Sequence, residues 1–297
     1  MEMVPLSSEQ RLIRIRNYID KMPSLSTTVT KVLEICNLPN PLPNDLNRVI
    51  SLDPVLTGQV LRLINSAYYS LPNQITSLTR AIIMLGINTV KNLALSTAVL
   101  GYLGKTHSLQ CLPIDQFWKH SICVGVTAKA LAAHKGIDPG LREEFFVAGL
   151  LHDLGKVPLS NRSPEEYKQA IALADLEQGA LRQAEMTTLG LDHGAVGRLI
   201  AEKWQLSDPL RDTLQFHHDP AAAPAGNRRV VILVALANIY ANLYDIGSAG
   251  DAFPQPRKIA LALKMAKMTW PEIQGLHDTV HSEVEKAQVF LQISKEA

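Results

Sequence analysis

Apolar residues recur every three to four positions along nearly the whole chain, and no segment alternates apolar and polar residues long enough to indicate a strand. This spacing is typical of amphipathic helices. In a representative segment, Asp53 is placed as an N-cap, Pro54 suits the first helical position, and apolar residues follow on one face as far as the turn near 71–73. We therefore predict an all-α protein.

The segment 104–113 is the most polar long connection in the middle of the chain. We place a boundary there between an N-terminal helical part, 1–104, and a second helical bundle, 114–250, with a C-terminal helical tail over 251–297. Gly86 separates two predicted helices of the first part, 77–85 and 88–103. The tail should carry one amphipathic helix, 270–297, that packs on one of the bundles. In the second bundle the predicted helices are 115–135, 141–156, 164–178, 193–204, 209–217 and 228–244.

The composition is that of a folded globular protein, with 46% apolar and 19% charged residues, so disordered and collagen-like chains are excluded. Lys and Arg number 29 against 28 Asp and Glu, which leaves no strong field to attract nucleic acid or an anionic membrane. The cluster Arg11, Arg14 and Arg16 fits the solvated face of a helix. We expect neither a nucleic acid nor a membrane as a partner.

Cellular location is indicated by the cysteines and by the longest apolar run. Three cysteines without a CxxC pair suit a reducing cytosol. The first ten residues lack the form of a secretion signal. The longest uncharged apolar stretch, 230–244, has 15 residues, fewer than the roughly 20 that span a bilayer. We therefore expect a cytoplasmic protein in which 230–244 is a buried helix.

Histidines are the most informative residues of the second bundle. His152 and Asp153 directly follow an apolar run, where a buried carboxylate needs a cation such as Lys156, an arginine or a metal. His217 and His218 are adjacent near a predicted helix end, so both rings could turn toward one point. The same bundle also contains His120 and His193.

Several neutral imidazoles with one carboxylate make a ligand set for transition metals such as Fe, Mn, Ni or Zn. We expect one or two such ions, and Asp153 could bridge two of them. The alternative is that each histidine makes its own separate hydrogen bond. We adopt this alternative for His107, His134, His277 and His281, since even the pair His277 and His281, at i, i+4 spacing, lacks a third ligand candidate nearby.

The order of His120, His152-Asp153 with Lys156, His193 and His217-His218 resembles the HD superfamily of metal-dependent phosphohydrolases, and within it the HD-GYP proteins. The segments 50–69, 75–82 and 85–87 are similar to the HDOD domain, a bacterial signalling module, and the resemblance covers roughly 22–245. It implies an N-terminal helical bundle packed on an HD-like helical bundle.

Carried over residue by residue, the resemblance implies one metal on Asp153, His193, His217 and His218, and another on His120, His152 and Asp153 with a carboxylate from a later helix. Asn238 stands where the family has that carboxylate. The Gly-Tyr-Pro signature is absent after His218, and Gln116 replaces a glutamate of some relatives. We therefore expect little or no hydrolysis of cyclic dinucleotides.

Three functions stay open at this point. The first is a regulatory module that meets a protein partner in a signalling pathway, with Asn65, Tyr68, Tyr69 and Arg80 either packing internally or forming the partner surface. The second is a metal-dependent phosphohydrolase acting on a nucleotide or other phosphate ester, in which Asp153 holds the metal and Lys156 offsets charge on the phosphoryl oxygens. The third is a di-iron oxygenase.

Overall fold

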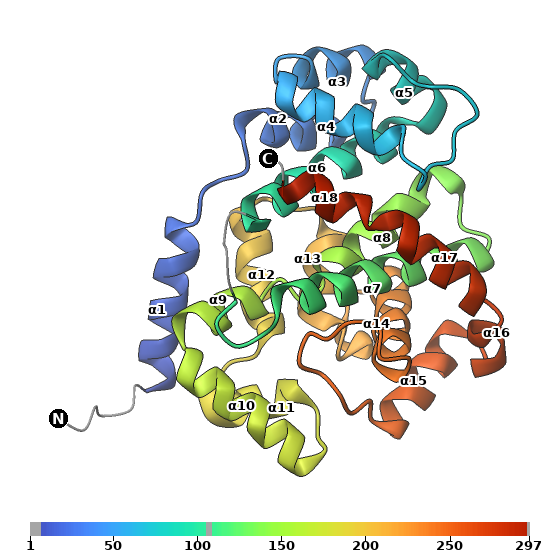
Figure 1. Cartoon of the computed structure of the whole chain (residues 1–297). Helices are drawn as coiled ribbons and strands as arrows, with labels where there is room; N and C mark the ends of the chain where they lie inside the picture. The colour runs from blue at the N-terminus through green and yellow to red at the C-terminus, as the bar shows by residue number, and fades with distance from the viewer. Residues whose placement is uncertain (1–6, 105–108, 296–297) are drawn as a thin grey trace.

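The computed structural model describes residues 7–104 and 109–295. Within these ranges every regular element is a helix, and no strand occurs, which confirms the predicted all-α class (Figure 1). His107, for which we expected no role in a metal site, lies outside the described residues.

The N-terminal bundle stands on one long helix, α6 (Ile87–Gly104), and forms the upper part of the molecule in Figure 1. Asp53 caps α4 as predicted, because its Oδ1 accepts from Leu56 N at 2.9 Å. Helix α4 ends at Ile64, earlier than expected, since Asn65 donates to Ile75 O and accepts from Ile75 N, both at 2.7 Å, and so closes the following loop. The other helices of this bundle are α2 (Thr27–Cys36), α3 (Pro43–Ile50), α4 (Pro54–Ile64) and α5 (Leu78–Leu85).

Helix α1 (Ser8–Lys21) packs mainly on the second bundle. It lies along α9 (Lys156–Arg162) and α12 (His193–Lys203) of the second bundle (Figure 1). Arg11 donates to Leu189 O at 3.2 Å, and the Trp204 indole donates to Pro23 O at 3.2 Å just beyond the helix. The start of the chain thus connects the two bundles.

Two antiparallel helices, α7 (Ile114–His134) and α8 (Arg142–Leu151), form the centre of the second bundle, and α14 (Arg228–Leu243) packs on both. They touch at Gly125 and Gly149, where a Cβ on either glycine would lie 2.7 Å from backbone atoms of the other helix. This contact places His120 of α7 near the carboxyl end of α8. Around them lie η1 (Pro139–Leu141), α10 (Pro164–Glu177), α11 (Leu181–Leu189), α13 (Asp208–Phe216) and η2 (Pro220–Ala222).

Several predicted helices differ from the structure. The single helix expected over 141–156 is broken at 152–155, and neither α11 nor α15 (Pro256–Ala266) was predicted. The tail helix expected over 270–297 is three helices, α16 (Trp270–Gln274), α17 (His277–Ala287) and α18 (Val289–Lys295), with α16 ending at Gly275. Because α17 packs on α7 while α18 packs on α4 and α6, the tail contacts both bundles rather than one.

The apolar stretch 230–244 belongs to α14, most of which is buried in the second bundle, as expected. Among the described residues, no single helix has the length and apolar composition to cross a bilayer, although α5 and the part of α6 as far as Gly101 would pass this test together as a pair bent by 119°.

Candidate metal centre

The five histidines and Asp153 converge on one buried place, although four separate segments carry them. His120 comes from α7, His152 and Asp153 from the turn after α8, and His193 from the first position of α12. His217 and His218 follow the last residue of α13. These side chains form two overlapping sets of atoms that could each hold a metal ion, and Asp153 belongs to both.

The break between α8 and α9 is what points Asp153 inward. Backbone bonds from Leu154 N to Leu151 O and from Lys156 N to Asp153 O, 3.0 and 2.9 Å long, span three residues, as in a 3₁₀ turn. With three residues per turn, Asp153 and Lys156 lie one above the other. A Cβ at Gly155 would overlap the His193 carbonyl, so the glycine lets this turn pass directly against α12.

The first set of candidate ligands is Asp153 with three imidazoles. Asp153 Oδ1 lies 3.4 Å from His193 Nε2 and 3.5 Å from His217 Nε2. The Nε2 atom of His193 is 3.3 Å from that of His217 and 2.9 Å from that of His218. Ligands bound about 2.0–2.2 Å from one ion lie about 3.0–3.5 Å from each other. The spacing of these four atoms therefore fits a single transition metal.

The second set consists of His120, His152 and the other oxygen of Asp153. Asp153 Oδ2 lies 3.2 Å from His152 Nε2 and 3.8 Å from His120 Nε2. His152 Nδ1 is 2.6 Å from Gly149 O, and since a carbonyl can only accept, Nδ1 donates and Nε2 keeps a lone pair. Within the described ranges, neither nitrogen of the buried His120 has a hydrogen-bond partner, nor has His152 Nε2. Buried polar atoms without a partner are costly, and a metal ion would bind the free lone pairs of these imidazoles, so these residues also fit a metal.

The protonation states favour metal binding. Burial lowers the pKa of His120 to about 3 and that of His217 to about 4, and it holds the pKa of His218 well below the usual value. Burial alone would raise the pKa of Asp153, but His152 and Lys156 outweigh it and hold that pKa well below its usual range. Neutral imidazoles and an ionised carboxylate are the forms that bind a metal.

Three acceptors of the protein surround the Lys156 ammonium. Its buried Nζ lies 2.9 Å from Asp153 Oδ2, 2.7 Å from Asp251 Oδ2 and 2.9 Å from Ala249 O. An ammonium has three hydrogens, and here three acceptors surround it. Its hydrogen bonds go to Asp251 and Ala249, and the catalytic role that the resemblance implied for Lys156 stays a prediction.

Two carboxylates of the site were missed by the sequence analysis. Glu185 of α11 is buried, and its Oε2 lies 2.6 Å from His193 Nδ1 and accepts from His193 N at 2.9 Å. Burial alone would lower the pKa of His193, but the Glu185 carboxylate outweighs it and raises that pKa. Glu185 shares the apolar helix face of Leu181, Ala184 and Leu189, a pattern that could have revealed it. Asp251 lies in an irregular segment without such a pattern.

Replacing Glu185 with Gln should weaken binding of the first metal about 10- to 100-fold, the usual effect of losing a carboxylate that orients a ligating histidine. Gln keeps the size of the side chain and one acceptor but removes the charge behind His193. Calorimetric titration with Mn²⁺ measures the change, and Glu177→Gln at an exposed position of α10 is the control. Equal affinities for both variants would show that Glu185 does not act through His193.

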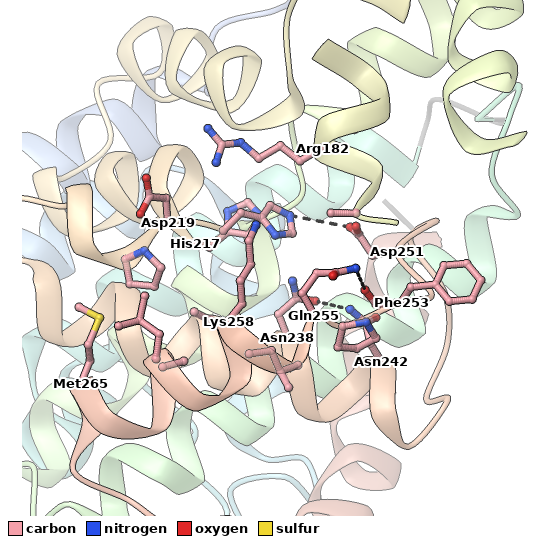
Figure 2. Close-up of a pocket in the computed structure, with 18 residues that line it drawn as sticks. Arg182, His217, Asp219, Asn238, Asn242, Asp251, Phe253, Gln255, Lys258 and Met265 are labelled. Atoms are coloured by element: carbon pink, nitrogen blue, oxygen red, sulfur yellow. Dashed lines mark hydrogen bonds and ion pairs between the residues drawn. The ribbon is translucent and has the colours of Figure 1, made fainter. Parts of the chain in front are cut away.

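Asn238 is buried on α14 and lines a cavity that ends at His217 and His218 (Figure 2). Its Oδ1 accepts from Asn242 Nδ2 at 3.3 Å. Three of the four histidines to which we gave no metal role lie in the described ranges, and each has a partner of its own. His134 lies 3.6 Å from Glu272, His277 lies 2.7 Å from the Tyr240 hydroxyl, and His281 lies 3.9 Å from Glu285.

The fold and the site together define the class of this protein: a helical bundle in which the adjacent pair His152-Asp153 and further histidines meet at one buried site. The HDOD domain family model matches residues 22–220, and the chain belongs to the HDOD domain family, as its sequence resemblance indicated. It is 26% identical over 244 residues to an uncharacterized protein of Treponema pallidum (strain Nichols), a match that covers 81% of this chain. The match covers 46% of that relative, so the chain spans about half the length of the curated relative.

Solved structures share the whole architecture. An HDOD domain protein of unknown function from Geobacter sulfurreducens is 28% identical, with a TM-score of 0.73 over 95% of this chain and 98% of that one. A candidate phosphohydrolase from Shewanella amazonensis SB2B is 23% identical, with a TM-score of 0.68 over 95% of this chain and 97% of that one. This second likeness concerns the fold alone.

Proposed function

We propose that this HDOD protein is a signal-transduction module whose His/Asp centre holds a transition metal and that it has little or no phosphodiesterase activity. The observation that carries the proposal is the position of Lys156, whose ammonium donates to Asp251 and Ala249 and forms an ion pair with Asp153. A metal ion bound by the His/Asp centre would supply Lewis acidity. The buried cation that would assist phosphoryl transfer is instead held by protein acceptors.

A regulatory role also needs a route from the metal centre to the rest of the molecule. Helices α7 and α8 provide one, because each carries a site histidine near one end and a contact with the N-terminal bundle toward the other. Lys129 of α7 donates to Glu143 of α8 at 2.7 Å and to the Tyr68 hydroxyl at 3.1 Å. Its ammonium also lies 4.5 Å from the centre of the Tyr68 ring, within reach of a cation–π interaction. A shift between α7 and α8 would thus alter the contact with Tyr68.

The residues that carried the HDOD resemblance in the first half have different surroundings. Asn65 closes a loop, and Tyr68 and Tyr69 lie at the contact with Lys129. Arg80 is exposed on α5, one helical turn before Ile83 and Met84, whose exposed fractions are 73% and 47%. We propose this face of α5 as the surface for a protein partner.

A metal-dependent phosphohydrolase acting on a nucleotide or another phosphate ester is the second candidate. The cavity beside His217 and His218 favours it, because a ligand there would reach the first metal position. The two candidates differ in what metal loading does to the protein. A phosphohydrolase gains turnover, whereas a regulatory module changes its conformation away from the metal.

One experiment separates them. Protein loaded with Mn²⁺ is assayed on bis(p-nitrophenyl) phosphate, and its amide hydrogen exchange is compared with that of the metal-free form. We expect turnover far below the ordinary enzyme range of about 1 to 1,000 per second. We also expect amide exchange over 54–85 to be slower in the Mn²⁺-loaded form than in the metal-free form, because amide exchange reports local opening. Lys129→Met should remove this change in exchange, while Lys135→Met at the end of α7 should retain it.

Turnover in the ordinary enzyme range would favour the phosphohydrolase instead. If metal binding left exchange over 54–85 unchanged in the wild-type protein, the regulatory proposal would be contradicted.

A further inference from the structure

A cavity of about 340 Å³ lies between α14, the turn after α13 and the segment 251–265 (Figure 2). His217, His218 and Asp251 are at one end of it. Much of its outer wall, from Asp251 through α15 to Met265, lies beyond residue 220, where the HDOD family match ends. This wall therefore comes from the part of the chain outside the family match.

Two cations line the cavity, Arg182 from α11 and Lys258 from α15. Arg182 donates through Nε to Asp192 at 2.6 Å, which fixes it beside the start of α12. The ammonium of Lys258 has no hydrogen bond or ion pair with any described residue, and the side chain extends toward the histidine end of the cavity (Figure 2). Burial and the nearby Arg182 lower the pKa of Lys258. An anion between them would relieve the repulsion of these two cations.

The rest of the lining suits an organic group. Apolar side chains from α14 and α15 line the middle of the cavity, namely Ala235, Ile239, Ala262 and Met265. Asn238 and Asn242 add amide groups on the α14 side, where a ligand could exchange hydrogen bonds with them. A ligand with both an apolar ring and polar edges would therefore match this part of the wall.

The volume limits the size of the ligand. Small-molecule pockets measure about 300–1,000 Å³, so a cavity of about 340 Å³ suits a mononucleotide better than a cyclic dinucleotide. We infer that this cavity binds an organic phosphate of mononucleotide size, with its phosphate between the metal centre and Lys258 and its organic part between α14 and α15. This inference rests on the proposed metal centre and gives it a ligand.

The test measures binding of AMP, phenyl phosphate and inorganic phosphate by calorimetry, with the protein in its Mn²⁺-loaded and metal-free forms. AMP should bind the loaded protein at least tenfold more tightly than inorganic phosphate does. Lys258→Glu should weaken AMP binding at least tenfold, because it replaces an attractive charge with a repulsive one. Lys264→Glu, an exposed position on the same helix, should change the affinity less than twofold and is the matched control.

Equal binding of AMP and inorganic phosphate would overturn the inference, since the organic part would then make no contribution. So would equal losses in Lys258→Glu and Lys264→Glu, or the absence of AMP binding to protein that holds its metal. Phenyl phosphate binding as tightly as AMP would support an organic phosphate but contradict a mononucleotide. The metal content, measured separately by elemental analysis, tests the metal centre itself. If AMP binds the metal-free form and Lys258→Glu removes that binding, the result would support the cavity as a binding site independently of the metal centre.

Discussion

Replacing Lys156 with Met should lower the free energy of unfolding of the metal-free protein by about 3–5 kcal/mol, the usual cost of removing one partner from a buried ion pair. Asp153 and Asp251 both lie within 2.9 Å of the Lys156 ammonium and would face each other without a cation. Mn²⁺ should restore much of this loss, because an ion that binds only the native state stabilises it. At a concentration 100-fold above the Kd, this binding adds about 2.7 kcal/mol to the free energy of unfolding. Urea unfolding with and without Mn²⁺ measures both effects.

The control is Lys168→Met, which removes an exposed lysine 3.1 Å from Glu165. Exposed pairs contribute at most about 1 kcal/mol, so this variant should unfold close to the wild-type protein and show no additional rescue by Mn²⁺. Should Lys156→Met prove as stable as Lys168→Met without metal, the two buried carboxylates cannot both be ionised, and our description of the site would be wrong.

Asn238→Asp should raise the metal content of the protein, measured by elemental analysis in phosphate-free buffer. Asp153 is the one carboxylate among the six clustered His and Asp side chains, so two divalent ions would keep most of their positive charge uncompensated. An amide oxygen is a weaker donor than a carboxylate, so the position that Asn238 is expected to ligate should bear most of that repulsion. The His217 and His218 position should fill first, while the second ion should bind tightly only in the variant or when phosphate bridges the two.

The structure adds a reason for the weakness of the second position. Asp153 Oδ2, the oxygen facing His120 and His152, is also the oxygen 2.9 Å from Lys156, so a second cation must compete with an ammonium. Asn242→Asp, one helical turn away on the same side of the cavity, is the matched control and should not raise the metal content. Two tightly held metals in the wild-type protein, unchanged by Asn238→Asp, would contradict this account.

The part of the fold that local interactions determine could be predicted from the sequence. Asp53 and Asp192 cap α4 and α12 through bonds to amides three residues ahead, and Gly86, at a φ of 84°, ends α5 before α6 begins. Such interactions join residues within one helical turn, so residue type and spacing suffice to predict them. The histidines could be singled out because several imidazoles are costly to bury in one apolar bundle unless they bind a common metal ion.

The tertiary structure alone decided which groups complete the site. Lys156 and Asp251 are 95 residues apart, and Glu185 reaches His193 only because the loop after α11 returns the chain to it. The helix break at 152–155 likewise follows from the close passage of Gly155 against His193 rather than from the helical pattern of 141–156. The sequence by itself determined the all-α class, the caps at Asp53 and Asp192 and the residue types of the histidine-rich ligand set, because these depend on residue type and on neighbouring residues. The path of the chain decided that Lys156 lies between two carboxylates and that α15 closes a cavity beside the histidines, because those contacts depend on how distant segments pack.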